Sequence, residues 1–289
     1  MTPLQSVRKR AGDAIFARVA GDEGPARRDR IHLAEGPRRF PSGSPIHVVH
    51  SDASMFVGGI RALLLQSMHP LAMAAVDAHS GFRGDPWGRL QRTSTFLAET
   101  TFGTDEDADG AIAVVRAVHD RVRGTAPDGR PYVASDPHLI RWVHVAEIDS
   151  FLRAHDRYGA RPLDAAGRDE YVSQTAHVAR ALGAVDVPET VAELEQVLAD
   201  YRPELEATDA ARRAARFILV QPPVPLTLRA PYGLLSAAGV AMMPRWTRWP
   251  LRLPWLPIVE ATAVRASGAL ITSAIRWAIG SAPPMPDHA

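Results

Sequence analysis

Apolar residues recur at helical spacing along most of the chain from about residue 50 onward. Residues 56–76 are almost continuously apolar, and Pro70 inside this stretch is expected to kink or divide the helix. Because a helix that is apolar on every side needs protein all round it, we expect this one at the centre of the fold. The pattern predicts further helices over residues 85–103, 104–123, 136–159, 165–184, 187–205 and 207–220.

Strand signals are sparse, since apolar runs such as HVV and FILVQ are too short to found a sheet. The sequence therefore predicts an all-α fold of about eight to ten helices, given usual helix lengths. Residues 1–45 are polar and rich in Arg, Gly and Pro, which indicates one short helix followed by an arm. We expect residues 46–289 to form a single helical domain, because the helices on both sides of the Pro-rich stretch near residue 222 are apolar.

Capping residues predict where several of these helices begin and end. Gly103 is expected to end one helix, and Thr104 is expected to cap the next, whose first turn carries three acids that favour the helix dipole. Asp136 and Pro137 suit the cap and first turn of the helix that follows.

The helix that starts at Thr104 contains the segment VRAVHDRVRG. We expect its apolar stripe to consist of Ala111, Val115, Val118 and Val122, with Ile112 and His119 on its flank. Arg123 follows His119 by one turn and is predicted to share its side of the helix. Such a pair suits a metal-centred cofactor with carboxylates, with imidazole on the metal and guanidinium on a carboxylate. The alternative is a buried structural histidine beside an Arg123 that pairs with Asp120.

Composition narrows the chemistry. The chain has no cysteine, which excludes disulfides, thiolate metal sites, iron–sulfur clusters and a cysteine nucleophile. The net charge of +1 gives no argument for a nucleic-acid partner. No signal peptide is visible at the N-terminus, so we expect a cytoplasmic protein.

The C-terminal quarter is basic and rich in Trp, Pro and Leu. Between residues 210 and 286 the only acid is Glu260, against nine arginines. The charges at Glu260, Arg265 and Arg276 argue against a membrane-spanning helix over residues 256–280. Peripheral membrane contact through Trp and Arg stays open.

Histidine is the strongest available ligand or proton carrier in this chain. Four of the eleven histidines lie in apolar helical contexts: His69, His79, His119 and His144. We interpret His69 and His144 as structural, with His144 as the second candidate ligand. Di-iron Glu-x-x-His pairs, His-Glu-x-x-His, a P-loop, a dinucleotide fingerprint and a G-x-S-x-G elbow are all absent from the sequence. With these motifs absent, a haem-type iron held by histidine is the metal site that the sequence favours.

A second cluster lies in RLQRT, residues 89–93. Arg89 and Thr93 share a helix face and Arg92 lies close to Arg89. Two arginines beside a hydroxyl, with no acid inside the motif, suggest an anionic or polar ligand. The alternative is that acids from elsewhere in the fold pair with them.

These motifs occur in an order that resembles the family of MpaB-type oxygenases and the catalytic domain of rubber oxygenase (latex clearing protein). The segments that carry the resemblance are residues 61–104, with DPWGRLQRTSTF at its centre, residues 115–145, and DSFL beyond them. The resemblance covers roughly residues 50 to 255.

The resemblance implies a globin-like helical core that encloses one haem b, with iron, for O₂ chemistry on a hydrophobic small molecule. By motif position, His119 would be the proximal iron ligand and Arg123 would lie near a propionate. The distal motif would correspond to Arg89, Arg92 and Thr93 as catalytic residues. A late cofactor-binding arginine would correspond to Arg248 or, as the second choice, Arg245.

Two departures from the family pattern bear on the substrate. Arg92 replaces the lysine of the distal motif, and the chain has no glutamate between residues 36 and 98 to match the catalytic glutamate of rubber oxygenase. Asp77 and His79 are the nearby alternatives for a base. These departures argue against polyisoprene and favour another apolar substrate. A non-catalytic haem sensor or carrier, and a haem-free helical interaction protein, are the alternatives.

Overall fold

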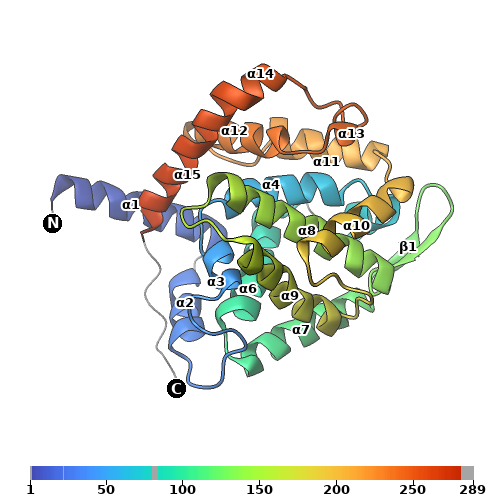
Figure 1. The fold of residues 1–289 in the computed structure, drawn as a ribbon, viewed down its shortest axis with the longest axis horizontal. Coiled ribbons are helices and arrows are strands. Elements are labelled where there is room, and N and C mark those ends of the chain that lie inside the picture. The colour runs from blue at the N-terminus through green and yellow to red at the C-terminus, as the bar shows by residue number, and fades with distance from the viewer. Residues whose placement is uncertain (1, 22, 80–83, 281–289) are drawn as a thin grey trace.

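The computed structural model of the chain describes residues 2–21, 23–79 and 84–280, and these residues are mostly helical (Figure 1). The all-α prediction is confirmed. The helices are α1 (Pro3–Ala20), α2 (Gly24–Leu33), α3 (Pro45–His50), α4 (Met55–Gln66), α5 (Pro70–His79), α6 (Pro86–Phe102), α7 (Asp105–His119), α8 (Pro137–Tyr158), α9 (Ala165–Leu182), α10 (Val191–Tyr201), α11 (Asp209–Val220), α12 (Leu226–Ala241), α13 (Arg245–Arg248), α14 (Pro257–Val259) and α15 (Arg265–Ile279). Short turns η1 (Arg202–Glu204) and η2 (Glu260–Val264) and a hairpin of β1 (Arg123–Thr125) and β2 (Pro131–Val133) complete the described elements.

Helix α4 lies at the centre, as its uniformly apolar sequence predicts. It packs along α8 on one side and against α12 on another. The approach to α8 is close: a Cβ at Gly58 would lie 2.8 Å from a ring carbon of Phe151. The apolar stretch divides where expected, because α5 begins at Pro70.

The predicted caps are present. The Thr104 hydroxyl accepts from the Asp107 backbone N–H, and the Asp107 side chain accepts from the Thr104 N–H, which satisfies two amides that the helix itself leaves unpaired. Gly103 follows α6, and Asp136 caps α8 by accepting from the His138 N–H. The α6, α7 and α8 boundaries marked by these caps therefore follow from local sequence.

The end of α7 differs from the prediction. The helix stops at His119, and Arg123 begins strand β1, so the two residues do not share a helix face. The chain turns because residues 122–134 close a hairpin, in which the Ala134 N–H donates to the Val122 carbonyl. The predicted stripe is also displaced, since Val118 is exposed and α7 instead buries Ile112.

The N-terminal segment holds more structure than expected, because α2 occupies part of the predicted arm. Helix α1 packs on α15 and α6.

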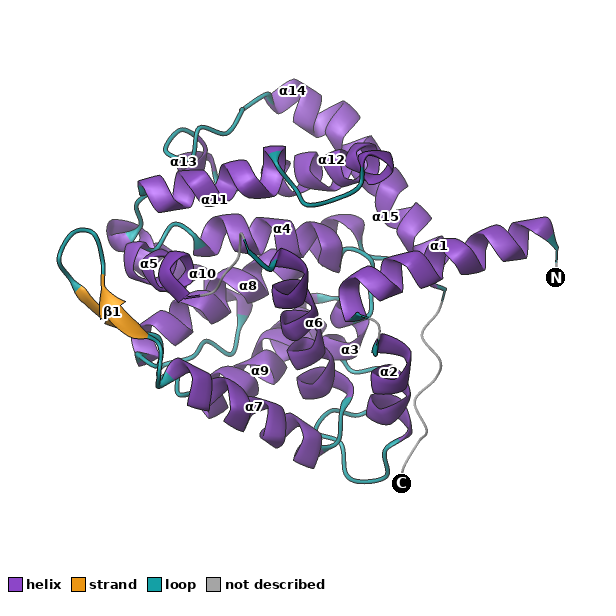
Figure 2. Cartoon of the chain, turned by 180° about the vertical axis from the view of Figure 1, so that it is seen from behind, coloured by secondary structure: helices purple, strands orange, loops and turns teal. Residues whose placement is uncertain are grey.

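The helices are arranged in successive levels around α4 (Figure 2). Helices α11 and α12 lie on one side of α4, and α8, α9 and then α7 follow on the other side in both views. Helix α6 packs on α7, and α3 and α9 connect this pair to α8.

Candidate functional site

Among the described residues, none covers one face of the central helix α4. Phe56, Gly59 and Leu63 lie at helical spacing on this face; Phe56 and Gly59 are partly exposed, and Leu63 is 41% exposed. A Cβ built at Gly59 would meet no atom within 4 Å. The other faces of this helix are buried. An apolar stripe that faces unfilled space on such a helix is typical of residues that line a ligand-binding site.

His119 is the last residue of α7 and is half-buried. Its Nδ1 atom is buried and has no hydrogen-bond partner. Burial lowers the pKa of the imidazole, and the opposing effect of Asp120 is smaller. The ring is therefore neutral near pH 7 and keeps a free nitrogen lone pair, which is the state that a metal ligand requires.

His144 and Glu147 lie on one face of α8, three residues apart. Burial, with a smaller contribution from Arg180, lowers the pKa of His144 to about 4, and its Nε2 atom is buried without a partner. Burial raises the pKa of Glu147 to about 7. Both residues keep some accessible surface.

A buried polar chain from α3, α6 and α9 approaches Glu147. The imidazole of His50 contacts the Thr101 hydroxyl at 2.8 Å and the Tyr171 hydroxyl at 3.2 Å. Burial, and to a smaller extent the charge of Glu147, raises the pKa of Tyr171, which places the phenol near that carboxyl.

The C-terminal end of α9 lies beside both histidine-bearing helices. Arg116 of α7 donates to the Ala181 carbonyl at 3.0 Å, and Arg180 is close enough to His144 to lower its pKa. The end of α9 is therefore a common neighbour of α7, which carries His119, and α8, which carries His144.

The three residues of the RLQRT cluster differ in exposure. Arg89 is partly buried and burial lowers its pKa. Arg92 is 66% exposed and pairs with Asp85 at 3.3 Å, so an acid from just outside the motif satisfies it. Thr93 is exposed.

The two predicted arginine partners of a cofactor have protein partners here. Arg123 is exposed and donates to the Asp120 carbonyl at 2.6 Å. Arg248 is buried and binds both carboxylate oxygens of Glu260 at 3.1 Å. A propionate role for either residue stays a prediction.

Glu147 is not among the site residues predicted from the sequence. The predicted alternatives for a base already have partners: Asp77 pairs with Arg213 at 2.9 Å, and His79 contacts the Tyr132 hydroxyl at 3.1 Å. Glu147 makes no hydrogen bond or ion pair with any described residue. The signal in the sequence was an acid three residues after a histidine on an apolar helix.

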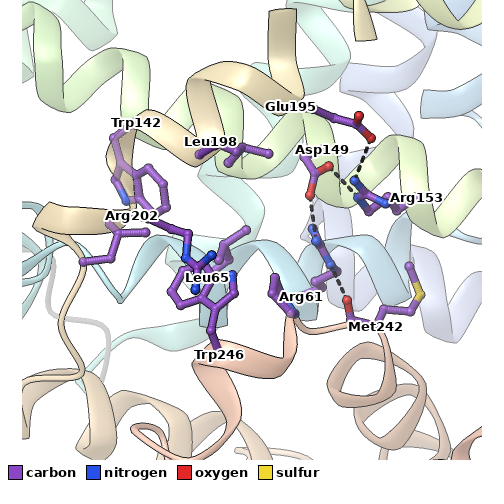
Figure 3. A pocket seen from close by; sticks show the side chains of 13 residues that line it. Arg61, Leu65, Trp142, Asp149, Arg153, Glu195, Leu198, Arg202, Met242 and Trp246 are labelled. Atoms are coloured by element: carbon purple, nitrogen blue, oxygen red, sulfur yellow. Dashed lines mark hydrogen bonds and ion pairs between the residues drawn. The ribbon is translucent and has the colours of Figure 1, made fainter. Parts of the chain in front are cut away.

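A surface pocket of about 390 Å³ lies elsewhere, between α4, α8 and α10 (Figure 3). None of the predicted site residues lines it. Its charged groups satisfy one another, with Arg61 on Asp149 at 2.6 Å and Arg153 on both Asp149 and Glu195. Because Arg61, Asp149, Arg153 and Glu195 pair with one another, we interpret this network as structural.

Residues 47–277 match the family described as "ER-bound oxygenase mpaB/B'/Rubber oxygenase, catalytic domain". The chain belongs to this family. The description of the family names an oxygenase catalytic domain, in agreement with the resemblance drawn from the motifs.

Two curated relatives match over 169 residues at 30% identity: "Uncharacterized protein Rv2237" of Mycobacterium tuberculosis and "Uncharacterized protein Mb2261" of Mycobacterium bovis. The match spans 58% of this chain and 57% of each relative. No solved structure matches the chain.

The raised pKa of Glu147 predicts a pH-dependent cost to stability. Below pH 4.5 the carboxyl is protonated in the folded and the unfolded chain and contributes nothing. As the pH rises from 4.5 to about 7 the unfolded chain ionises first, so stability is lost. We expect Glu147→Gln to match the wild type at pH 4 and to exceed its unfolding free energy by about 1 to 3 kcal/mol at pH 8.

Denaturant unfolding at both pH values measures this difference. Glu170→Gln, at an exposed position on α9, is the matched control and should show no pH-dependent difference. A Glu147→Gln effect that is equal at pH 4 and pH 8 would contradict a buried, unpaired carboxyl.

Proposed function

We propose that this chain is a haem-dependent oxygenase or oxidase that acts on a hydrophobic small molecule. The observation that carries the proposal is the unfilled space beside Gly59, in a central helix that is largely buried on its other faces. A haem is a flat, mostly apolar group, and a glycine without neighbours in an apolar wall is the kind of surface that its face requires.

The residues present fit such a group. His119 would hold the iron, because its imidazole is neutral and lacks a hydrogen-bond partner at Nδ1. In the globin-like arrangement that we propose, Phe56 and Leu63 would contact the apolar ring. Arg123 and Arg248 would be candidates for the propionates, which for Arg248 requires exchange of its contact with Glu260.

Haem b, when bound, would supply the redox chemistry with O₂. The chain's own part is binding, exclusion of water and proton control. Arg89 would carry positive charge on the distal side, and Arg92 and Thr93 would complete that side if they turn inward. Glu147 would hold or release a proton near neutral pH, since its pKa is about 7. The apolar face of α4 would exclude water.

Gly59→Leu tests whether the space on α4 is the cofactor's. The change removes a glycine from a helix interior and meets no atom, so we expect a folded protein of equal or greater stability. We expect the haem content per chain to fall at least about tenfold, because the new side chain occupies the ring's place. Haem content follows from the absorbance of purified protein, and folding from circular dichroism.

Gly110→Leu is the matched control, since Gly110 is also helical, also has no atom within 4 Å of an added Cβ, and lies on the exposed side of α7. It should keep the wild-type haem content. Equal haem content in Gly59→Leu and Gly110→Leu would mean that the α4 face does not border the cofactor.

We also propose peripheral contact with an anionic membrane at the edge formed by α13 and α14 (Figure 1). Trp249 is 90% exposed, and Ile258 is strongly exposed as well. Several arginines lie close to these residues in the sequence, and the one acid between residues 210 and 280, Glu260, is neutralised by Arg248. By length and composition Pro257–Ile279 could cross a bilayer, and little of it is buried. Its Arg265 and Arg276, the latter paired with Asp52, favour attachment at the surface.

Co-sedimentation with vesicles tests this contact. We expect binding to phosphatidylglycerol vesicles and little binding to phosphatidylcholine, with about tenfold weaker binding for Trp249→Ser/Ile258→Ser. The control Val114→Ser/Val185→Ser removes exposed apolar side chains elsewhere and should bind as the wild type does. Loss of binding in both double variants, or equal binding to both lipids, would contradict the proposal.

A further inference from the structure

Two histidines and a glutamate gather at a place distant in sequence from the predicted haem ligands. His69 immediately precedes α5, His138 lies in the first turn of α8, and Glu204 ends η1. The three donor atoms lie within 4.8 Å of one another. Nε2 of His138 is 2.8 Å from Oε2 of Glu204, and Nε2 of His69 is 3.6 Å from the same oxygen.

His69 brings an unsatisfied polar atom to this group. The side chain is almost fully buried, and its Nε2 atom has no hydrogen-bond partner. A buried donor or acceptor without a partner is costly, so such an atom points to a missing ligand.

The contacts of His138 also point to a cation. The Tyr201 hydroxyl donates to the His138 carbonyl at 2.8 Å, so it can accept from Nδ1 of the same residue at 3.4 Å. A histidine that carries its proton on Nδ1 presents a bare lone pair at Nε2. That lone pair and the Glu204 carboxylate would then be two acceptors 2.8 Å apart, and a positive charge is needed between them.

The backbone fixes the three segments. Asp136 accepts from the His138 N–H at 2.9 Å, and the Glu206 N–H donates to the carbonyl of Met68, next to His69, at 2.7 Å. Nδ1 of His69 accepts from the Ala72 N–H at 3.5 Å. A metal bound at Nε2 would require the ring proton to sit on Nδ1, so Nδ1 could no longer accept from Ala72. The hydrogen bond lost is long, and three metal–ligand bonds are gained.

We propose that His69, His138 and Glu204 bind one divalent transition-metal ion, with zinc as the representative ion. Two imidazole nitrogens and one carboxylate oxygen form a donor set that zinc uses, whereas Mg²⁺ and Ca²⁺ take oxygen ligands. His138 and Glu204 are exposed on one side, which leaves room for water as a further ligand. The ion would join α5, α8 and the turn after α10.

Calorimetric titration of Zn²⁺ into the full-length chain, prepared without a histidine tag and freed of metal by a chelator, tests the site. We expect one ion per chain with a dissociation constant of about 1 μM or tighter, and no response to Mg²⁺. His138→Ala and Glu204→Gln should each weaken zinc binding at least about tenfold. Both positions are exposed, so these variants should fold.

His177→Ala, at an exposed histidine on α9, is the matched control and should bind zinc as the wild type does. The titration is repeated with His119→Ala, in which the zinc site should be unchanged whether or not haem binds. Absence of stoichiometric binding at about 0.1 mM zinc would overturn the proposal and leave a proton as the shared cation. Equal binding by the wild type, His138→Ala and Glu204→Gln would overturn it as well.

Discussion

Asp149→Ala is expected to lower the free energy of unfolding by about 3 to 5 kcal/mol. The carboxylate of Asp149 is buried and binds the guanidinium of Arg61 at 2.6 Å, and Arg61 is only 2% exposed. Arg61 also donates to the Ser150 hydroxyl and to the Met242 carbonyl, which hold it between α4, α8 and the end of α12 (Figure 3). Removal of Asp149 would leave a buried cation without a counter-charge.

Denaturant unfolding of two further variants separates the loss of the buried counter-charge from the loss of the exposed ion pair. Glu195→Gln changes the exposed member of the same network and should cost no more than about 1 kcal/mol. Arg61→Met/Asp149→Leu should recover most of the loss, because an apolar pair of similar size needs no counter-charge. An Asp149→Ala variant within about 1 kcal/mol of the wild type would show that water or a rearranged side chain satisfies Arg61.

His119→Ala is expected to abolish haem binding, or to reduce it at least about tenfold, because it removes the proposed iron ligand. His144→Ala should keep haem content within about twofold of the wild type. His144 is a stringent control, because it is also a neutral imidazole and its Nε2 atom has no hydrogen-bond partner among the described residues. Haem content and the position of the Soret band in purified proteins measure the difference.

Imidazole rescue distinguishes ligation from a structural role. His119→Gly should regain the Soret band when imidazole is added to the solution, which a merely destabilised variant would not do. If His144→Ala loses haem and His119→Ala keeps it, the ligand assignment is reversed.

Local chemistry made much of the fold predictable. Pro70 interrupts a helix, whereas the side chains of Thr104 and Asp136 accept from backbone amides at the start of a helix. Each residue acts within a few positions of the chain, so its effect can be predicted from the sequence. The end of α7 was not predictable in this way. Valine and arginine at positions 122 and 123 continue a helical pattern, and the hairpin with residues 131–133 overrides it.

The candidate site was predictable only in part, because burial and pairing are tertiary properties. The sequence predicted His119 as the ligand, but it did not show that Arg92 would pair with Asp85 or that Arg248 would pair with Glu260. For Glu147 it gave only the spacing to His144. The interest of Glu147 comes from the absence of a partner among the described residues and from a pKa near neutrality.

The absorption spectrum of the purified wild-type protein, after expression with a supply of haem, is the most direct test of the proposed haem dependence. We expect a Soret band and about one haem b per chain by pyridine haemochromogen assay. A folded protein that shows no Soret band under these conditions would contradict that dependence.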